Sequence, residues 1–350
     1  MYTIGMEDSK EISFLPIQSE MNIRYRLSLL MQNHVYPGIG TTYMLPPNPI
    51  HWNLLQLVPH KYWSILKLFF NPDMELVSYI VALTDSNHLQ QTASSILSIS
   101  ELCGTTMALL RIFINFETLA TKAQQNLFRA NNVSSKLFRA FAELDDPNYL
   151  QKVFETPIKQ CVAMTNDGLQ LDQNIKDLKG IVGTFLDHVF IHQAPIRLRV
   201  LANCMQRIVM RKFPEARYNS VAAILFLRLF CPYITATNNF VFLDPNEPLL
   251  KLTKAAKTNL INISRILQKL ANGARFNDNS SLNIELNNFL DDKTKALQTY
   301  LQDFCHPSMQ QLFDQPYNIT QETLIKQVNK KLHDFDYLYD ILKSSTILSK

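Results

Sequence analysis

The chain has few glycines and few cysteines for its length. Its 350 residues include 8 Gly and 5 Cys, and the cysteines form no CxxC pair. Scarce glycine argues against Gly-rich phosphate-binding loops and against sheet-rich folds. An odd number of scattered cysteines, most of them in apolar helical surroundings, indicates reduced thiols in a cytosolic protein.

Long hydrophobic runs, alternating patterns and a strong net charge are also missing. No window reaches the roughly 18 apolar residues that a membrane-spanning helix needs, and residues 1–10 contain no apolar signal region. The sequence shows no sustained period-two alternation and no Asn-Gly or Asp-Gly hairpin, so no strand is predicted. The formal charge of +4 is too small to indicate nucleic-acid binding by itself. We therefore expect neither a transmembrane helix nor a nucleic-acid partner.

What the sequence does have is helical periodicity and enough apolar residues for a large core, at 47% hydrophobic and 18% charged. We expect residues 1–50 to form an N-terminal arm, because 36–49 is rich in proline and glycine, and 51–345 to form one helical domain. The fold class is all-α. The predicted helices are 51–70 broken at Pro59, 73–83, 92–116, 133–144, 149–164 with a kink or break at Pro157, 172–192, 195–213, one starting at 214 that ends at Pro232, 250–273, 282–304 and 320–342.

Residues 126–136, NLFRANNVSSK, predict a loop followed by the start of a helix. Asn131 and Asn132 tolerate turn geometry, and Asn132 is a suitable N-cap. Leu127 and Phe128 are apolar where the pattern indicates a loop, so we expect them to anchor it to the body. Arg129 would then point outward.

Residues 221–231, VAAILFLRLFC, are apolar except for Arg228. This segment is too short to span a bilayer and predicts a buried core helix. Burying an unpaired guanidinium is very costly. Arg228 must therefore reach an edge or donate to several acceptors, and loop carbonyls are natural acceptors.

Three motifs in this order resemble the Ras GTPase-activating proteins. Residues 127–136 resemble the finger loop of that family, 226–232 its FLR…P signature, and 268–272 its Q-x-L-A-N helix. The resemblance covers roughly residues 63–289. It implies a RasGAP-like all-α fold, in which a central catalytic helical body is joined by an accessory lobe formed from the flanking helices.

The resemblance also implies roles. The protein would be a GTPase-activating protein for a Ras-family small GTPase, with Ras favoured over Rap, and would not itself be the enzyme. Arg129 would be the arginine finger and Arg228 would hold its loop. Arg265 stands where relatives often carry a lysine that contacts the GTPase. The predicted GTPase-binding residues are Leu127, Phe128, Asn131, Lys136 and Arg265.

The same resemblance predicts the surroundings in which the protein works. No cofactor of its own is expected, because Mg-GTP is bound by the partner GTPase. Contact with membranes would be peripheral and through the GTPase, in a cytoplasmic protein recruited to the inner face of membranes.

Several alternatives remain open. A non-catalytic scaffold could keep the fold and bind the GTPase without accelerating it, and a helical scaffold unrelated to GTPases is a more distant reading. Tyr233 stands where the family usually has a small residue. Arg139 lies in a second Leu-Phe-Arg-Ala tetrapeptide, and we expect it on a helix surface.

Two further features have an ordinary structural reading and a functional one. His188 and His192 have metal-ligand spacing on a helix. No third ligand is evident, so a packed or surface pair is favoured. The arginine-rich helix 195–212 could touch phospholipid or RNA, but a solvated face or a groove wall is favoured.

Overall fold

Every regular element in the described part of the chain is a helix. The computed structural model describes residues 54–70, 77, 80, 81, 84, 85, 87–130, 132–164, 175–236, 252–277, 280–307 and 321–344. The expected arm 1–50 and most of the predicted helix 73–83 lie outside these residues. The elements are α2 (Leu54–Leu57), η2 (His60–Tyr62), α3 (Trp63–Phe70), α5 (Leu89–Leu102), α6 (Thr106–Ala120), η3 (Gln124–Asn126), α7 (Val133–Asp145), α8 (Tyr149–Met164), α9 (Ile175–Ile191), α10 (Ile196–Lys212), η5 (Pro214–Ala216), α11 (Arg217–Ala222), η6 (Ala223–Phe230), α12 (Cys231–Thr235), α13 (Lys254–Ala271), α14 (Ser281–Phe304), α16 (Gln321–Lys330) and α17 (Leu332–Ser344).

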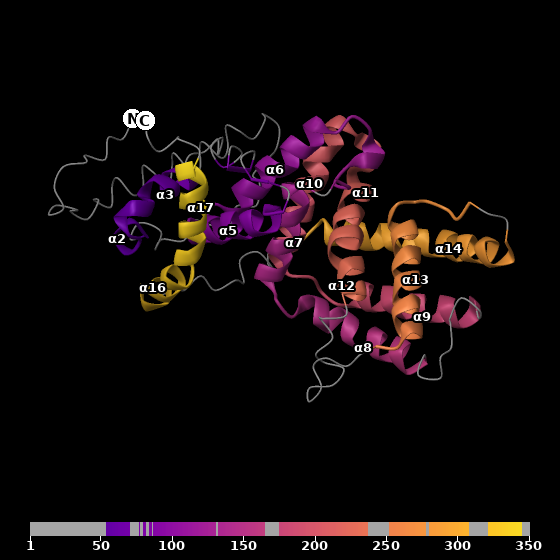
Figure 1. Ribbon diagram of the computed structural model, residues 1–350. Helices are drawn as coiled ribbons and strands as arrows, with labels where there is room; N and C mark the ends of the chain where they lie inside the picture. The colour runs from indigo at the N-terminus through magenta and orange to yellow at the C-terminus, as the bar shows by residue number, and fades with distance from the viewer. Residues whose placement is uncertain are drawn as a thin grey trace.

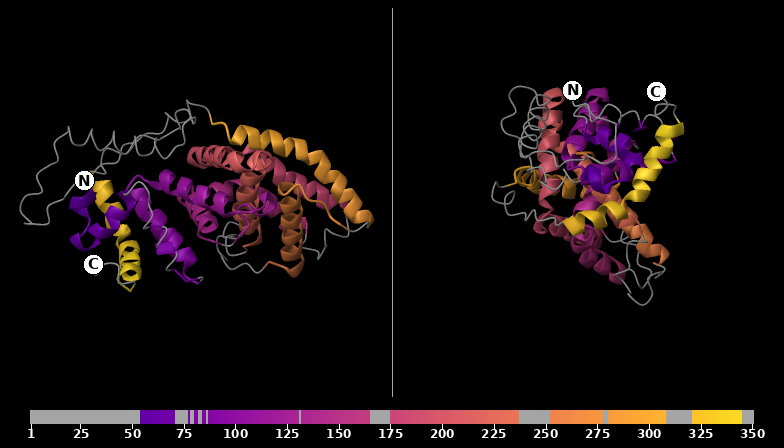
Figure 2. Two further views of the ribbon diagram at one scale, coloured as in Figure 1. Left: turned by 90° about the horizontal axis from the view of Figure 1, so that it is seen from above. Right: turned by 90° about the vertical axis from the view of Figure 1, so that its left-hand side faces the viewer.

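Helices from both ends of the chain form one lobe, which confirms the predicted accessory lobe. Figure 1 shows α2 and α3 beside α16 and α17, and Figure 2 shows this group at one end of the molecule with α14 at the other. The Tyr62 ring lies 5.3 Å from the Phe335 ring, and the Lys61 ammonium is 3.0 Å from the Asp336 carboxylate. Contacts separated by more than 270 residues therefore close the lobe.

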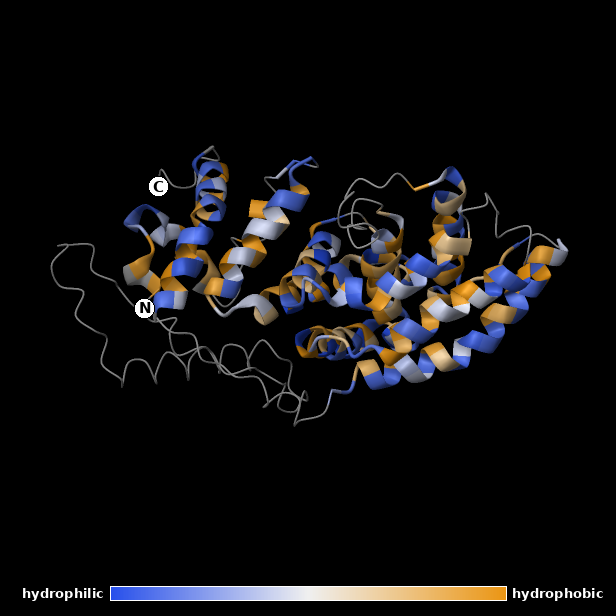
Figure 3. Cartoon of the chain, turned by 90° about the horizontal axis from the view of Figure 1, so that it is seen from below, coloured by the Kyte–Doolittle hydropathy of each residue, from blue (hydrophilic) through white to orange (hydrophobic). Residues whose placement is uncertain are grey.

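Each helix of the body buries one apolar side. Figure 3 shows hydrophobic and hydrophilic residues separated around the helices, as expected for amphipathic helices that share a core. All five cysteines are buried and free. The core therefore consists of packed aliphatic, aromatic and thiol side chains, and no disulfide links these cysteines.

Two predicted helices are each divided in the structure. Residues 92–116 belong to α5 and α6, which are separated at Gly104. Gly104 has φ 66°, and Thr105 donates its backbone N–H to the Ser100 carbonyl at 2.9 Å. This is the left-handed C-terminal cap that glycine favours. Residues 320–342 are likewise divided, between α16 and α17 at Lys331.

The prediction that Pro232 ends its helix is wrong. Helical structure runs from Pro214 to Thr235 because the π-helical segment η6 precedes Pro232, which lies in the first turn of α12. A proline ring clashes with the carbonyl four residues earlier in an α-helix, and a wider π turn relieves this contact. In a similar way, α8 contains Pro157 without ending there.

The same run, Pro214–Thr235, is the one described helix that is long and apolar enough to cross a membrane. The sequence predicted no such window. Of its apolar window, 61% is buried inside the molecule. Core helices of large domains have this composition too, so the burial favours a core helix.

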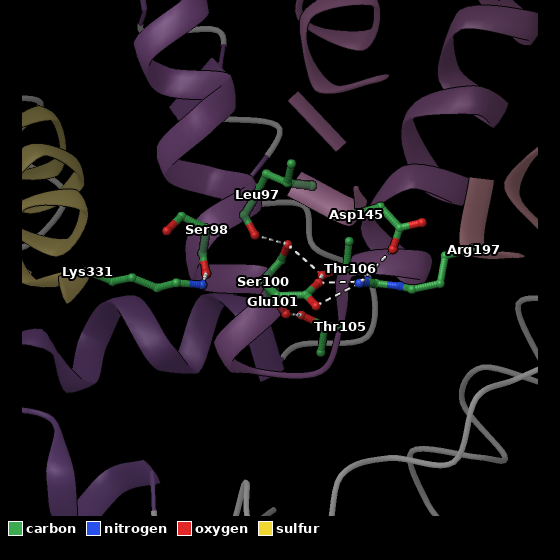
Figure 4. Close-up of polar contacts among 9 residues, drawn as sticks. All are labelled: Leu97, Ser98, Ser100, Glu101, Thr105, Thr106, Asp145, Arg197 and Lys331. Carbon is green, nitrogen blue, oxygen red and sulfur yellow. Dashed lines mark hydrogen bonds and ion pairs between the residues drawn. The ribbon is translucent and has the colours of Figure 1, made fainter. Parts of the chain in front are cut away.

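A half-buried ion-pair cluster joins α5, α7 and α10 (Figure 4). Arg197 donates to both carboxylate oxygens of Glu101, at 2.9 Å and 2.7 Å, and lies 3.3 Å from Asp145. Next to this cluster, the Lys331 ammonium donates to the Ser98 carbonyl at 2.9 Å. The last two helices are thereby tied to α5 by a hydrogen bond to its backbone.

We predict that Asp145 makes the protein less stable as the pH rises from about 4 to about 6. Burial, opposed by Arg197 and reinforced by Glu101, raises the pKa of Asp145 to about 6, whereas an unfolded Asp has a pKa of about 3.9. Between these values the folded state keeps a proton that the unfolded chain has released, so stability is present at low pH and is lost as the pH rises. Up to about 3 kcal/mol of unfolding free energy is involved.

Urea unfolding of the wild type and of Asp145→Asn between about pH 4.5 and about pH 7 checks this prediction. The wild type should lose stability over this window, and the variant should lose much less. Glu101 does not produce the same loss of stability with rising pH. Burial raises its pKa, but the bonds and charge of Arg197 outweigh burial and lower it, so its contribution is lost only as the pH falls below about 4.3. Equal pH dependence in both proteins would contradict the assignment to Asp145.

Candidate functional site

The loop between α6 and α7 is anchored by two buried side chains. Leu127 is 3% exposed and Phe128 is 1% exposed, and the Phe128 ring meets the Phe138 ring edge to face at 5.7 Å. Among the described residues other than glycine, only Phe128 has a positive φ, of 55°. This strained backbone turns Phe128 into the core while Arg129 remains exposed. The predicted anchors and outward arginine are confirmed.

The predicted contact of these anchors with a GTPase stays a prediction. The side chains of Leu127 and Phe128 are buried in the core of the protein alone. Any contact by these two residues would be made through the backbone. Their side chains instead fix the height and direction of the loop.

Arg228 binds this loop on both sides of Arg129. Its Nε donates to the Phe128 carbonyl at 3.0 Å and its Nη2 donates to the Ala130 carbonyl at 2.9 Å. Burial lowers the pKa of Arg228, and the charge of Glu117 opposes that effect. The half-buried guanidinium therefore has the loop-carbonyl acceptors that the sequence predicted, and it bridges the carbonyls of the two residues next to Arg129.

The Arg129 guanidinium rests on the third motif. Its Nη2 donates to Oδ1 of Asn272 at 3.0 Å, and Asn272 is the C-cap of α13. The three sequence motifs, far apart in the chain, thus meet around one exposed arginine. A single hydrogen bond to a neutral amide is a modest restraint at the surface, and an anionic ligand would be a stronger partner for the guanidinium.

The remaining predicted residues lie on neighbouring helices. Arg265 is exposed on α13, seven positions before Asn272. That spacing puts both residues on one side of the helix, about 10 Å apart along its axis. Lys136 lies in the first turn of α7, whose N-cap is Asn132 in a capping box with Ser135. Asn131 lies outside the described residues.

The base of the loop is held by side chains that the sequence patterns did not indicate. The Asn132 side-chain amide donates to the Glu117 carboxylate on α6. The Lys212 ammonium donates to the carbonyls of Leu119 and Thr121, both at 2.7 Å. No spacing rule relates these positions, because the contacts join the end of α6 to the start of α7 and to α10.

Two other features singled out in the sequence, Tyr233 and the pair His188 and His192, make packing contacts. Tyr233 is half-buried and its ring lies 5.9 Å from the Phe154 ring, so it packs against α8. His188 and His192 stack at 5.4 Å, and His192 Nδ1 lies 2.8 Å from the His188 carbonyl. In the part of the chain that the structure covers, no group of three or more His, Cys, Asp or Glu residues is arranged to hold a metal ion.

Known proteins share this sequence pattern. Residues 164–272 match the family model described as GTPase-activator protein for Ras-like GTPase. The chain is 23% identical over 256 residues to the probable Ras GTPase-activating-like protein ngap of Dictyostelium discoideum, covering 69% of this chain and 28% of that protein. It is 22% identical over 270 residues to neurofibromin-A of the same organism, covering 68% and 29%. It is 24% identical over 270 residues to the Ras GTPase-activating protein raskol of Drosophila melanogaster, covering 68% and 17%.

These matches and the helical fold make the chain similar to the Ras GTPase-activating protein (RasGAP) domain family, over residues 164–272 in the family model and over about two thirds of the chain in the relatives. The chain spans less than a third of the length of these three relatives. The matched range of the family model contains Arg228, Arg265 and Asn272, and it does not reach the loop of Arg129.

Proposed function

We propose that the chain accelerates GTP hydrolysis by a Ras-family small GTPase, and that Arg129 supplies the catalytic guanidinium in trans. One observation carries the proposal. An exposed arginine sits at the tip of a loop whose peptide groups on both sides of it are bound by a second arginine, Arg228. A surface arginine with no such task needs no support of this kind.

The chemistry of phosphoryl transfer explains why such an arginine is useful. In the transition state, negative charge is spread over the phosphoryl oxygens and the leaving oxygen, so positioning and electrostatic stabilisation dominate catalysis. A guanidinium is planar, permanently charged and rich in donors. Arg129 can therefore stabilise this charge without any proton transfer of its own.

The surroundings of Arg129 fit insertion into a partner. Its side chain makes one hydrogen bond to Asn272. Hydrogen bonds to charged phosphoryl oxygens would be stronger than this bond to a neutral amide and would more than replace it. The backbone is held by Arg228 and by two buried anchors. Because the loop backbone is already fixed, little entropy is lost in ordering it when the partner binds. The side chain needs only to exchange its hydrogen-bond partner.

The proposed partner is a GTP-bound small GTPase of the Ras family, Ras in the first place and Rap in the second. Arg265 and Lys136 would offer positive charge to the acidic surface of the GTPase beside the inserted arginine. Mg-GTP would arrive bound to the partner, so we assign no cofactor to this chain. The GTPase remains the enzyme and would bring the complex to the inner face of membranes.

Single-turnover hydrolysis of GTP by a small panel of Ras and Rap proteins, with and without the chain, tests the proposal. The chain should accelerate hydrolysis by at least one panel member. Tight binding to the GTP form without acceleration would replace the proposal with a non-catalytic scaffold. If the chain neither binds any panel member nor accelerates its hydrolysis, the proposed function fails and only the fold remains.

Arg139 provides a matched control for Arg129, because both are the arginine of a Leu-Phe-Arg-Ala tetrapeptide. Arg139 is half-buried on α7, and its Nε is 2.9 Å from Glu143 one turn later. Such a pair contributes about 0.3–0.5 kcal/mol. We expect Arg139→Ala to leave the accelerated rate within about twofold of wild type, because the residue acts only along its own helix. A large loss of rate in this variant would mean that the second tetrapeptide carries the function.

A further inference from the structure

Glu117 touches both ends of the loop that carries Arg129. Where the chain leaves α6, the Glu117 carbonyl accepts hydrogen bonds from the Thr121 N–H at 3.0 Å and from its hydroxyl at 2.7 Å. Where the chain enters α7, the Glu117 carboxylate accepts a hydrogen bond from the Asn132 side-chain amide. The backbone and side chain of one residue thereby close a loop of about ten residues.

The Asn132 amide is fully oriented by its two partners. Its Oδ1 accepts the Ser135 N–H at 3.1 Å as the N-cap of α7, which leaves its Nδ2 facing Glu117. The capping bond is local and would form in any helix with this sequence. The bond to Glu117 spans 15 residues, and it is the one that ties the start of α7 to the end of α6.

The negative charge of Glu117 also acts on Arg228, the arginine that holds the middle of the loop. Burial lowers the pKa of Arg228, and the negative charge of Glu117 acts in the opposite direction. Glu117 thus favours the charged guanidinium that binds the Phe128 and Ala130 carbonyls. From α10, Lys212 adds a second hold on the loop entrance at the carbonyls of Leu119 and Thr121.

We infer that Glu117 is a positioning residue for Arg129: by accepting a hydrogen bond from the Asn132 side-chain amide, its carboxylate closes the base of the loop that carries Arg129. Glu117 itself touches no reacting atom. The catalytic part of this inference rests on the proposed function, whereas the closing of the loop does not depend on it.

Glu117→Ala should lower the maximal accelerated rate by roughly 10- to 100-fold, because a displacement of about 1 Å at a catalytic group costs rate on that scale. The GTPase concentration at half-maximal rate should change by less than about threefold, since the docking surface is intact. Glu117→Gln should recover most of the rate, because its amide oxygen still accepts from Asn132 Nδ2. In an Arg129→Ala background, Glu117→Ala should cause no further loss, because no finger remains to be positioned.

Amide hydrogen exchange supplies a readout that needs no GTPase. In Glu117→Ala, exchange should become faster across residues 121–130, while α9 and α13 keep their wild-type protection. Glu143→Ala is the matched control, because it removes another carboxylate from a helix beside the loop, one that is paired with Arg139. This control should change neither the rate nor the exchange.

The possible outcomes separate the inference from the proposed function. Wild-type rate and wild-type loop exchange in Glu117→Ala would overturn the inference and leave the proposed function intact. Faster exchange throughout the body, with no recovery in Glu117→Gln, would also overturn it, because Glu117 would then only stabilise the fold. If the wild type accelerates no GTPase, the proposed function fails, and localised loop exchange in Glu117→Ala still supports the closing of the loop.

Discussion

Replacing Arg129 with alanine should reduce the accelerated rate of GTP hydrolysis by roughly 10³–10⁵-fold, to that of the GTPase alone. This is the general range by which an arginine supplied in trans accelerates hydrolysis by Ras-type GTPases. It corresponds to about 4–7 kcal/mol of transition-state stabilisation. The effect should be this large because the guanidinium interacts most strongly with charge that develops only in the transition state. Single-turnover hydrolysis with saturating activator measures it.

Folding and binding should be nearly unchanged in the same variant. Arg129 is exposed, and its side chain donates a hydrogen bond to Oδ1 of Asn272 at 3.0 Å, so its loss should cost about 1 kcal/mol or less. Affinity for the GTP-bound partner should stay within a few-fold, since ground-state contacts elsewhere are kept. Arg129→Lys should restore little, because an ammonium lacks the planar fork of donors. Loss of folding in Arg129→Ala would instead make the residue structural.

Replacing Arg228 with alanine should have the second-largest effect, on both rate and stability. The variant loses the bonds to the Phe128 and Ala130 carbonyls. Phe128 then holds its strained backbone without this support. We expect a fall in the maximal rate of roughly 10²-fold, from a loop that samples wrong positions, and a loss of about 1–3 kcal/mol in unfolding free energy. Single-turnover kinetics and urea unfolding measure the two effects.

Arg228→Lys separates the charge of this residue from its geometry. A lysine keeps the positive charge beside Glu117 but cannot bridge two carbonyls with a rigid fork. Its rate should therefore lie between those of the wild type and Arg228→Ala. An unchanged rate in Arg228→Ala would remove the loop-holding role altogether, and a rate in Arg228→Lys equal to that of the wild type would show that charge alone suffices.

Much of this site could be predicted from the sequence because its signals are local. Leu127 and Phe128 stand out as apolar residues in a loop, and Arg228 stands out as the one charge in an apolar helix. Each observation rests on the physical cost of exposing or burying the wrong group. The buried anchors and the bonds of Arg228 to the loop carbonyls follow from these costs.

Other features could not be predicted because they depend on tertiary contacts. The bond between Asn132 and Glu117 joins two helix ends, and no periodicity relates them. Helix continuity through Pro232 depends on a π-helical turn, whereas local rules place a helix end there. The division of α5 from α6 at Gly104 was missed because apolar spacing continues across it, although glycine is a recognised terminator.

Binding to a transition-state analogue tests the central claim most directly. A GDP-loaded Ras-family protein that responds to the chain should form a stable complex with it when aluminium fluoride is added, because the analogue reproduces the charge of the transferring phosphoryl group. The account predicts that wild type and Arg139→Ala form this complex, that Arg129→Ala does not, and that all three bind the GTP form alike. A stable aluminium fluoride complex with Arg129→Ala would contradict the account, because transition-state binding would then not depend on this arginine.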